Sequence, residues 1–261
     1  MPAIGLGTWQ LEGRECVEAV RDALALGYRH IDTAEAYQNE EAVGVGIRRS
    51  AVDRDEVWIT TKVWWEHLDR SDCLRSAHKS LERLGTDYVD LLLIHWPDED
   101  SVIDDALSAM VQLQDEGKVR HIGVSNFTPT LLRRALEEAP VICNQVEYHP
   151  FLAQDELVAM AQEEDLILTA YSPVAQGRVT EDETLRRIGE AHGKSAAQVA
   201  LRWLLQQPKV AAIPRSSSHR HRRANLEIFD FRLDEDEMEE ISALDEGLRL
   251  IEPEFAPDWE R

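Results

Sequence analysis

Four residues that can transfer a proton or stabilise a charge lie at the ends of consecutive apolar segments or just after one. Asp32, Lys62 and His95 each lie at or next to the last residue of such a segment, and Tyr37 follows Asp32 by five residues. This set suits proton transfer to a developing alkoxide. A phenol has an ordinary pKa of about 10, and a nearby ammonium group lowers it by favouring the phenolate. We therefore expect Tyr37 to act as the acid, with Lys62 beside it.

The other two residues have supporting roles in this hypothesis. Asp32 would hold Lys62 charged and oriented, and His95 would donate a hydrogen bond to the substrate oxygen or help relay the proton. Three histidines elsewhere, His192, His219 and His221, lack the spacing of zinc ligands. No metal site is expected, and no serine nucleophile motif competes at these positions.

Each of the four residues also has a purely structural interpretation. Asp32 can cap a helix or form half of a structural ion pair, Lys62 can extend its ammonium group into solvent, and a single histidine such as His95 is common in protein cores. Tyr37 can simply pack. Burying several charged groups in one place is costly, so a site where all four meet favours catalysis.

Short apolar segments alternate along the chain with longer segments of helical periodicity. The expected strands are Ile4–Thr8, His30–Thr33, Val57–Val63, Val89–His95, His121–Ser125, Ile142–Glu147, Ile167–Tyr171 and Val210–Pro214. The expected helices include Glu15–Leu26, Arg70–Leu84, Ile103–Glu116, Thr130–Glu138, Glu156–Glu164 and Ala196–Gln206. Strands separated by helices pair in parallel, and a closed (β/α)8 TIM barrel accounts for eight of them better than an open sheet. We expect one domain over residues 1–261.

Such a barrel brings the C-terminal ends of its strands to one face, where active sites are built. Asp32, Lys62 and His95 would meet on that face.

Local signals predict where some segments end. Ser71 is expected to cap the helix that Gly85 terminates. The acidic, proline-containing tail from Glu252 to Arg261 is expected to be a loop or a frayed end.

The composition limits where the protein works and what it binds. With a formal net charge of −22 and a pI of about 4.7, the chain repels nucleic acid and anionic membranes. It has no apolar segment long enough to span a membrane and only three widely spaced cysteines, so we expect a cytoplasmic protein. The acidic surface favours a monomer. It also indicates adaptation to a salt-rich cytoplasm (a halophilic protein), with an ordinary acidic protein as the alternative.

Two long runs of sequence resemble motifs of the aldo-keto reductase family. One is GYRHIDTAEAYQNE at residues 27–40, and the other, residues 81–97, contains DYVDL and IHWP. The resemblance covers almost the whole chain and points to short-loop members similar to diketogluconate reductases. The family's catalytic tetrad matches Asp32, Tyr37, Lys62 and His95. The resemblance thus implies a barrel enzyme that reduces small aldehydes or ketones to alcohols, with Tyr37 as general acid and the hydride coming from nicotinamide.

The resemblance also implies a nicotinamide cofactor, although no G-x-G-x-x-G motif follows a strand. Family segments that contact the carboxamide match Ser125, Asn126 and Gln145, and Tyr171 matches the aromatic residue that stacks on the nicotinamide ring. Other positions expected to contact the cofactor are Thr8, Trp9, Asp32, Ser172, Pro173, Ile213, Pro214, Ser216, His221 and Asn225. The alternative role for these polar residues is capping of strand ends.

The phosphate end departs from the family pattern. Arg215 occupies a position where lysine is common, and its guanidinium fork suits a phosphate. Aligned on Asn225, the chain lacks the arginine and glutamate that the family often has there. The basic run HRHRR at residues 219–223 would supply Arg220 or Arg222 as a clamp for a 2′-phosphate, so NADPH is preferred to NADH. A solvated helix start is the alternative interpretation of this run.

Large aromatic residues are expected to form the substrate pocket. Trp9, Trp64 and Trp96 follow or end predicted strands on one face, and with Tyr37 and His95 they would surround a carbonyl substrate. Packing inside the barrel is the alternative. We also expect the hairpin that usually closes the barrel bottom in the family to be missing, and the loop after Trp96 to be short. We expect an open pocket with broad specificity.

Two other functions fit parts of the sequence. A nucleotide sensor on the same fold would bind NADPH with little turnover, and the fold alone does not exclude it. A barrel lyase or isomerase would use Lys62 as a Schiff base, which the neighbouring Asp32 and Tyr37 disfavour. For a reductase, the candidate substrates are small sugars, dicarbonyls such as methylglyoxal, and diketo acids.

Overall fold

The strands form one closed barrel in the computed structural model, which describes residues 1–97 and 103–259. Eight parallel strands follow one another in chain order: β1 Leu6–Gly7, β2 His30–Asp32, β3 Trp58–Val63, β4 Val89–Ile94, β5 Val119–Ser125, β6 Val141–Glu147, β7 Ile167–Tyr171 and β8 Val210–Ala212. Bridges join the first and last segments: the Gly5 N–H donates to Ala212 O, and the Ala212 N–H donates to Ala3 O, both at 2.9 Å. The predicted (β/α)8 barrel is confirmed.

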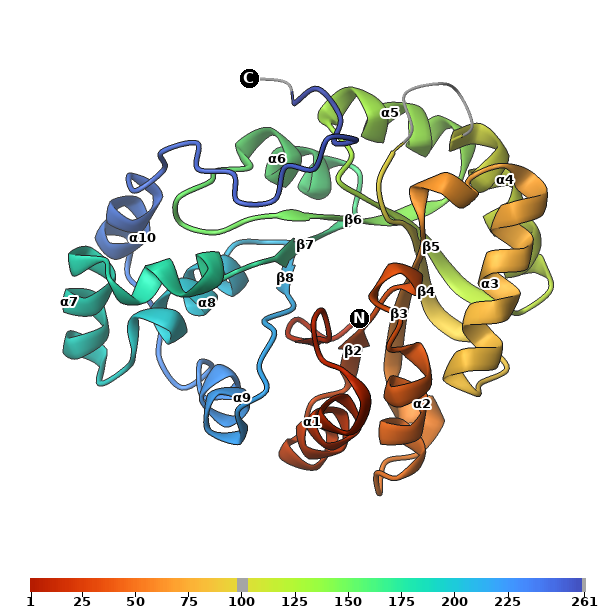
Figure 1. Cartoon of the computed structure of the whole chain (residues 1–261). Coiled ribbons are helices and arrows are strands. Elements are labelled where there is room, and N and C mark those ends of the chain that lie inside the picture. Colours follow the sequence, from red (N-terminus) through yellow and green to blue (C-terminus); the bar gives the residue numbers. More distant parts are fainter. Residues whose placement is uncertain (98–102, 260–261) are drawn as a thin grey trace.

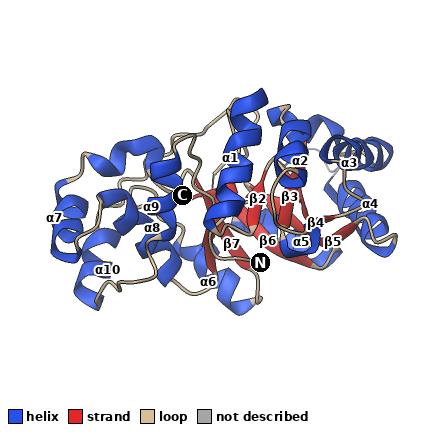
Figure 2. Cartoon of the chain, turned by 90° about the horizontal axis from the view of Figure 1, so that it is seen from below, coloured by secondary structure: helices blue, strands red, loops and turns tan. Residues whose placement is uncertain are grey.

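Helices surround the strands, as Figures 1 and 2 show. They are α1 Gly13–Leu26, α2 Glu40–Arg48, α3 Arg70–Leu84, α4 Ile103–Asp115, α5 Pro129–Glu138, α6 Asp155–Glu163, α7 Glu183–His192, α8 Ala196–Gln206, α9 His219–Leu226 and α10 Glu235–Ser242. In α1, buried residues recur every three or four positions, at Cys16, Val20 and Ala23, so that one face packs on the barrel. Within the described residues, no helix combines the length and the apolar character needed to cross a membrane.

Every predicted strand is present, but β1 and β8 are shorter than expected. β8 ends at Ala212 rather than at Pro214. Proline has no N–H for the strand ladder, although the carbonyl of Pro214 still accepts the Gly7 N–H at 3.2 Å.

The predicted N-terminal cap of α3 is wrong, whereas its predicted C-terminal end is confirmed. The cap of α3 is Asp69, whose carboxylate accepts the N–H groups of Ser71 and Asp72, both at 3.1 Å. Ser71 instead donates its hydroxyl to Asp69 at 2.9 Å. Gly85 ends the helix in the left-handed region at φ 65°, as predicted.

The N-terminus packs into the barrel near the N-terminal ends of the strands. Met1, Trp58 and Ile142 contact a small buried cluster that includes Leu91 and Leu93. The start of the chain therefore helps to fill the region where no closing hairpin was expected.

The C-terminal tail has no helix or strand from Glu252 to Trp259, as predicted, but it is not frayed. The Phe255 ring stacks on Trp65 with centroids 5.2 Å apart, and the Trp259 ring packs against Trp96. Of the two predicted alternatives, a loop or a frayed end, these residues form the loop. The last two residues of the tail, and most of the short loop predicted after Trp96, lie outside the described residues.

Candidate active site

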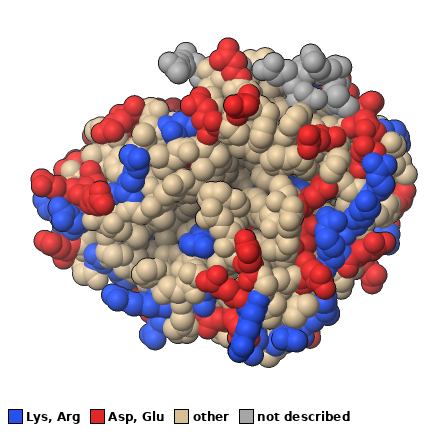
Figure 3. Space-filling view, viewed as in Figure 1, with Lys and Arg blue, Asp and Glu red and all other residues tan. Residues whose placement is uncertain are grey.

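A cavity of about 840 Å³ opens at the C-terminal ends of the strands, and Figure 3 shows it as the hollow in the middle of the face. Most of the predicted site residues line it: Thr8, Trp9, Asp32, Tyr37, Trp64, His95, Trp96, Ser125, Asn126, Gln145, Tyr171, Ser172, Pro173, Ile213 and Arg215. The face predicted to carry the active site is therefore the one that is hollowed.

A buried ion pair lies beneath the cavity. Lys62 Nζ on β3 is 2.5 Å from Asp32 Oδ1 on β2, and it also donates to the carbonyl of Thr33 at 2.9 Å. The second carboxylate oxygen of Asp32 accepts the side-chain amide of Gln145 at 2.8 Å. Each charged group offsets part of the desolvation of the other, although burial still outweighs Lys62 at Asp32 and raises the pKa of its carboxyl group. The arrangement fixes the position of the Lys62 ammonium group.

Tyr37 lies directly above this pair. It ends the short 3-10 helix Glu35–Tyr37 that follows β2, and Gln38 closes that turn in the left-handed region at φ 55°. Tyr37 Oη is 3.5 Å from Lys62 Nζ, at the outer limit of a hydrogen bond. The phenol faces the cavity, so a bound molecule can reach its oxygen.

The surroundings keep Tyr37 protonated and Lys62 charged. Burial raises the pKa of Tyr37, and the Lys62 ammonium group opposes that rise only in part. The ammonium acts in the expected direction, but the expectation of a lowered pKa is wrong because desolvation outweighs it. Burial alone would lower the pKa of Lys62, but Asp32 and Tyr37 raise it overall.

His95 follows β4 and is 8% exposed. Its ring meets the ring of Tyr37 edge-on, with centroids 5.6 Å apart, and the ring of Trp64 at 5.3 Å. Burial and the nearby Lys62 charge hold the pKa of His95 well below its usual value. Its buried Nδ1 has no hydrogen-bond partner in the described part of the chain. A neutral imidazole beside the phenol can donate one hydrogen bond to a bound oxygen.

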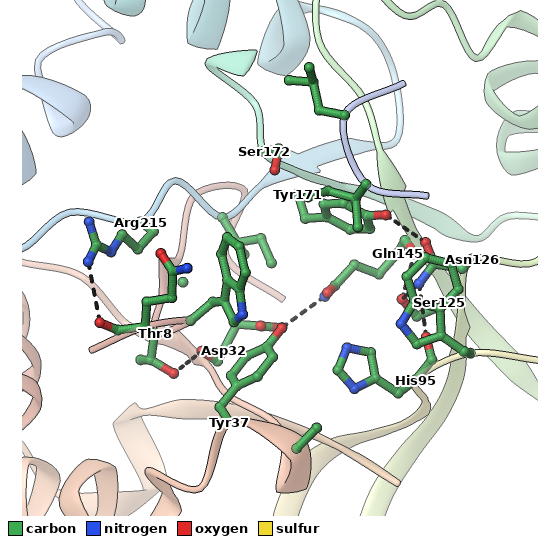
Figure 4. A pocket seen from close by; sticks show the side chains of 18 of the residues that line it. Thr8, Asp32, Tyr37, His95, Ser125, Asn126, Gln145, Tyr171, Ser172 and Arg215 are labelled. Atoms are coloured by element: carbon green, nitrogen blue, oxygen red, sulfur yellow. Dashed lines mark hydrogen bonds between the residues drawn. The ribbon is translucent and has the colours of Figure 1, made fainter. Parts of the chain in front are cut away.

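A hydrogen-bonded network forms another side of the cavity, at the ends of β5, β6 and β7 (Figure 4). Tyr171 donates its hydroxyl to Asn126 Oδ1 at 2.8 Å, and the Asn126 amide donates to His95 O at 2.9 Å. Ser125 donates to Gln145 O at 2.8 Å. Asn126 adopts a left-handed φ of 63°, which turns its side chain into this network. The structure thus gathers the four residues that were expected to hold a nicotinamide.

The predicted phosphate loop follows β8. Arg215 is exposed on the cavity wall and makes one contact of 3.3 Å, to the carbonyl of Gln10. The hydroxyl of the buried Ser216 accepts the N–H of Ser218, which caps α9. Pro214, between Ile213 and Arg215, does not line the cavity.

The basic run of α9 divides between two roles. Arg222 is 5% exposed, pairs with Asp22 at 2.7 Å and donates to the carbonyl of Ser216 at 3.0 Å. Its guanidinium therefore braces the phosphate loop from behind. Arg220 and His221 are exposed, whereas Asn225 is buried on the inner side of the helix. Of the two arginines suggested as a 2′-phosphate clamp, Arg220 is the one that is accessible.

The sequence interpretation missed one wall of the cavity. Leu250, Ile251, Glu252, Pro253 and Phe255 line it, although the tail was expected to be a loop or a frayed end. The signal available in the sequence was Phe255, an aromatic residue between two prolines, because aromatic residues are rare in segments that stay unpacked.

The residues present fit a nicotinamide dinucleotide. One cavity joins the side that carries Asn126, Gln145 and Tyr171 to the side that carries Arg215, so groups able to hold an amide and a cation able to pair with a phosphate line one site. Within residues 1–97 and 103–259, no cluster of His, Cys, Asp or Glu has the arrangement of a metal site.

Comparison with protein families agrees with this geometry. The model of the Aldo/keto reductase family matches residues 3–246. The chain is 45% identical over 253 residues to a glyoxal reductase of Bacillus subtilis (strain 168), covering 96% of this chain and 91% of the relative. It is 39% identical over 266 residues to the methylglyoxal reductase DkgB of Escherichia coli O157:H7, covering 100% and 99%.

Solved structures show the same similarity. A putative 2,5-diketo-D-gluconic acid reductase B superposes with a TM-score of 0.97 at 41% identity, covering 100% of this chain and 94% of the other. MGS-M4, an aldo-keto reductase from a deep-sea metagenome library of the Medee basin, superposes with a TM-score of 0.94 at 38% identity, covering 98% and 96%.

Proposed function

This chain belongs to the aldo/keto reductase family, and from that premise we propose that it reduces small, uncharged aldehydes and ketones to alcohols with NADPH, using Tyr37 as the proton donor. Glyoxal and methylglyoxal are the substrates that its relatives' names suggest. The observation that carries the proposal is the buried Lys62–Asp32 pair with Tyr37 Oη 3.5 Å from the ammonium group.

The cofactor has a defined place in this proposal. Ser125, Asn126 and Gln145 would hold its carboxamide, and the ring of Tyr171 would lie against the nicotinamide. When bound, the dinucleotide supplies the hydride. The family implies NAD(P)H, and the accessible Arg220 and Arg215 favour NADPH because each guanidinium can pair with a phosphate.

Tyr37 supplies the proton to the carbonyl oxygen. Its raised pKa keeps the phenol protonated at neutral pH, so the donor is available throughout the physiological range. The Lys62 ammonium group, which Asp32 holds in place, stabilises the negative charge that develops as the proton leaves. Neutral His95 donates a hydrogen bond that orients the carbonyl oxygen toward Tyr37.

The shape of the site supports small substrates. Aromatic rings of Trp64, Trp96 and Phe255 border the cavity beside His95. Such rings exclude water from the reacting carbonyl and provide no cation to pair with a carboxylate. Neutral dicarbonyls therefore suit this wall better than diketo acids.

The alternative roles of the site fit less well. A Schiff base needs a free amine on Lys62, but this group is buried, held by Asp32 and kept as an ammonium. A sensor would need no proton donor, whereas Tyr37 is positioned with its ammonium partner.

A turnover assay tests the proposed function. NADPH absorbance is followed with glyoxal, methylglyoxal, a small aldose and a diketo acid, and the alcohol product is identified. We expect consumption of NADPH with the uncharged dicarbonyls and formation of one alcohol per cofactor. Tight binding of NADPH without turnover of any carbonyl would refute the proposal and favour the sensor.

A further inference from the structure

The chain that follows α10 forms part of the substrate site. We call residues 248–255 the C-terminal strap. It runs past the ends of the barrel strands (Figure 1), and residues 250–253 together with Phe255 line the cavity. Any change in the position of the strap therefore changes the shape of the pocket.

A buried carboxylate holds one end of the strap. Glu147, the last residue of β6, has a fully buried side chain. Its oxygens accept the N–H of Leu250 at 3.0 and 3.1 Å and the N–H of Ile251 at 3.0 Å. His149 Nε2 lies 3.2 Å from the same carboxylate. Hydrogen bonds to a charged acceptor are about twice as strong as neutral ones, so this contact fixes the backbone of the strap.

An aromatic cluster holds the other end. The Phe255 ring lies 5.3 Å from Trp64, 5.2 Å from Trp65 and 5.6 Å from Trp96, measured between ring centroids. Trp64 and Trp96 come from the loops after β3 and β4 and also line the cavity. The strap thus connects β6 to the aromatic wall beside His95.

Glu147 does not line the cavity, and so it does not touch the substrate. We propose that Glu147 is a positioning residue that sets which aldehydes the enzyme prefers, because it holds the strap, and through it Phe255, against the substrate pocket. The effect on substrate preference rests on the proposed function, whereas the contact between Glu147 and the strap does not. With the strap held, a small dicarbonyl is enclosed on both sides. With the strap released, the pocket widens, which weakens contacts to small substrates and admits larger ones.

Three variants separate this role from general stability. Glu147→Gln leaves one acceptor oxygen but places an NH2 group near the strap N–H groups. Phe255→Ala removes the other attachment. Glu40→Gln is the matched control, because Glu40 is also fully buried, and its carboxylate binds Thr61 at 2.5 Å and Arg83 at 2.6 Å away from the strap.

The kinetic readout is the ratio of kcat/KM for methylglyoxal to kcat/KM for 2-naphthaldehyde. We expect Glu147→Gln to lower this ratio about tenfold, within the range that pocket contacts supply. The dissociation constant of NADPH should stay within about twofold. Phe255→Ala should act in the same direction, and the double variant should add little, because both changes release one strap. Glu40→Gln should leave the ratio unchanged.

A ratio that Glu147→Gln leaves at the wild-type value would overturn the proposal. So would an equal loss of kcat for both aldehydes, or weaker NADPH binding with selectivity intact, since either result gives Glu147 a different role.

Hydrogen exchange tests the contact without any turnover. The amides of Leu250 and Ile251 should exchange faster in Glu147→Gln than in wild type and Glu40→Gln. Unchanged exchange at these amides would refute the contact even if the enzyme is active. Conversely, a wild type that reduces no aldehyde would refute the proposed function, while faster exchange in the variant would still establish that Glu147 holds the strap.

Discussion

The floor and the rim of the cavity are built by different kinds of contact. The floor consists of Asp32, Lys62 and Gln145, which are buried and joined by hydrogen bonds of 2.5 and 2.8 Å. On the rim, Trp9 is 44% exposed and Arg215 makes one hydrogen bond of 3.3 Å. The floor is thus fixed before a substrate arrives, whereas the rim side chains can adjust to what binds.

This difference separates two tasks of the site. Groups that stabilise a developing charge act best when they do not have to reorganise during the reaction, which requires a fixed floor. Groups that select substrate and cofactor gain from adaptable contacts. Changes in the floor should therefore affect stability and chemistry, and changes in the rim should affect binding.

The largest effect is expected from breaking the ion pair in the floor. Lys62→Met leaves the carboxylate of Asp32 buried without its cation, and it should lower the free energy of unfolding by about 3–5 kcal/mol. Adding Asp32→Asn removes the unpaired charge and should restore most of the lost stability without restoring activity. Urea unfolding measures both. If Lys62→Met alone is as stable as wild type, this ion pair does not stabilise the floor.

A smaller effect, on the choice of cofactor, is expected at Arg220 on α9, outside the cavity lining. Arg220→Ala should raise the dissociation constant of NADPH about tenfold, or about 1.4 kcal/mol, and leave that of NADH unchanged. Arg223→Ala is the control, because Arg223 is bonded to Glu227 at 2.9 Å along the same helix. Fluorescence titration measures both constants. Equal losses for the two dinucleotides would assign Arg220 a role other than binding the 2′-phosphate.

The outer surface should respond to salt more than the floor does. The chain has a net charge of −22, and salt screens the repulsion between its carboxylates. We expect the Tm to be higher by several degrees in molar KCl, because a gain of 1 kcal/mol raises the Tm of a chain of this size by roughly 2–4 °C. Thermal melts in dilute buffer and in KCl provide the measurement. Equal melting temperatures would end the hypothesis of adaptation to salt.

The smallest effect is expected from pH. Tyr37 has a raised pKa and stays protonated until the pH exceeds it, so reduction loses its proton donor only in strong base. His95 has a lowered pKa and stays neutral down to acidic pH. The kcat for reduction should therefore change by less than about twofold between pH 6 and 9. An inflection near pH 6.5 would mean that His95 titrates normally.

Two residues of the floor could be predicted from the sequence because they lie at the ends of neighbouring strands. Asp32 and Lys62 follow apolar segments, and the parallel barrel brings those ends together. The net direction of the Tyr37 pKa shift could not be predicted, because it depends on how far burial outweighs the ammonium group.

The contact between Glu147 and the strap could not be predicted for a different reason. Glu147 and Leu250 are 103 residues apart, and the contact uses backbone N–H groups that every residue except proline possesses. No side-chain type at positions 250 and 251 signals it. The role of Arg222 behind the phosphate loop likewise depends on Asp22, 200 residues away in the chain.

If Tyr37 donates the proton, its removal should slow the reaction itself, and a single-turnover experiment measures that step. Enzyme saturated with NADPH is mixed with methylglyoxal, and the loss of NADPH absorbance is followed for wild type and Tyr37→Phe. We expect a rate constant lower by about 100-fold or more in the variant, with the dissociation constant of NADPH within about twofold of wild type. An unchanged rate constant would contradict proton donation by Tyr37.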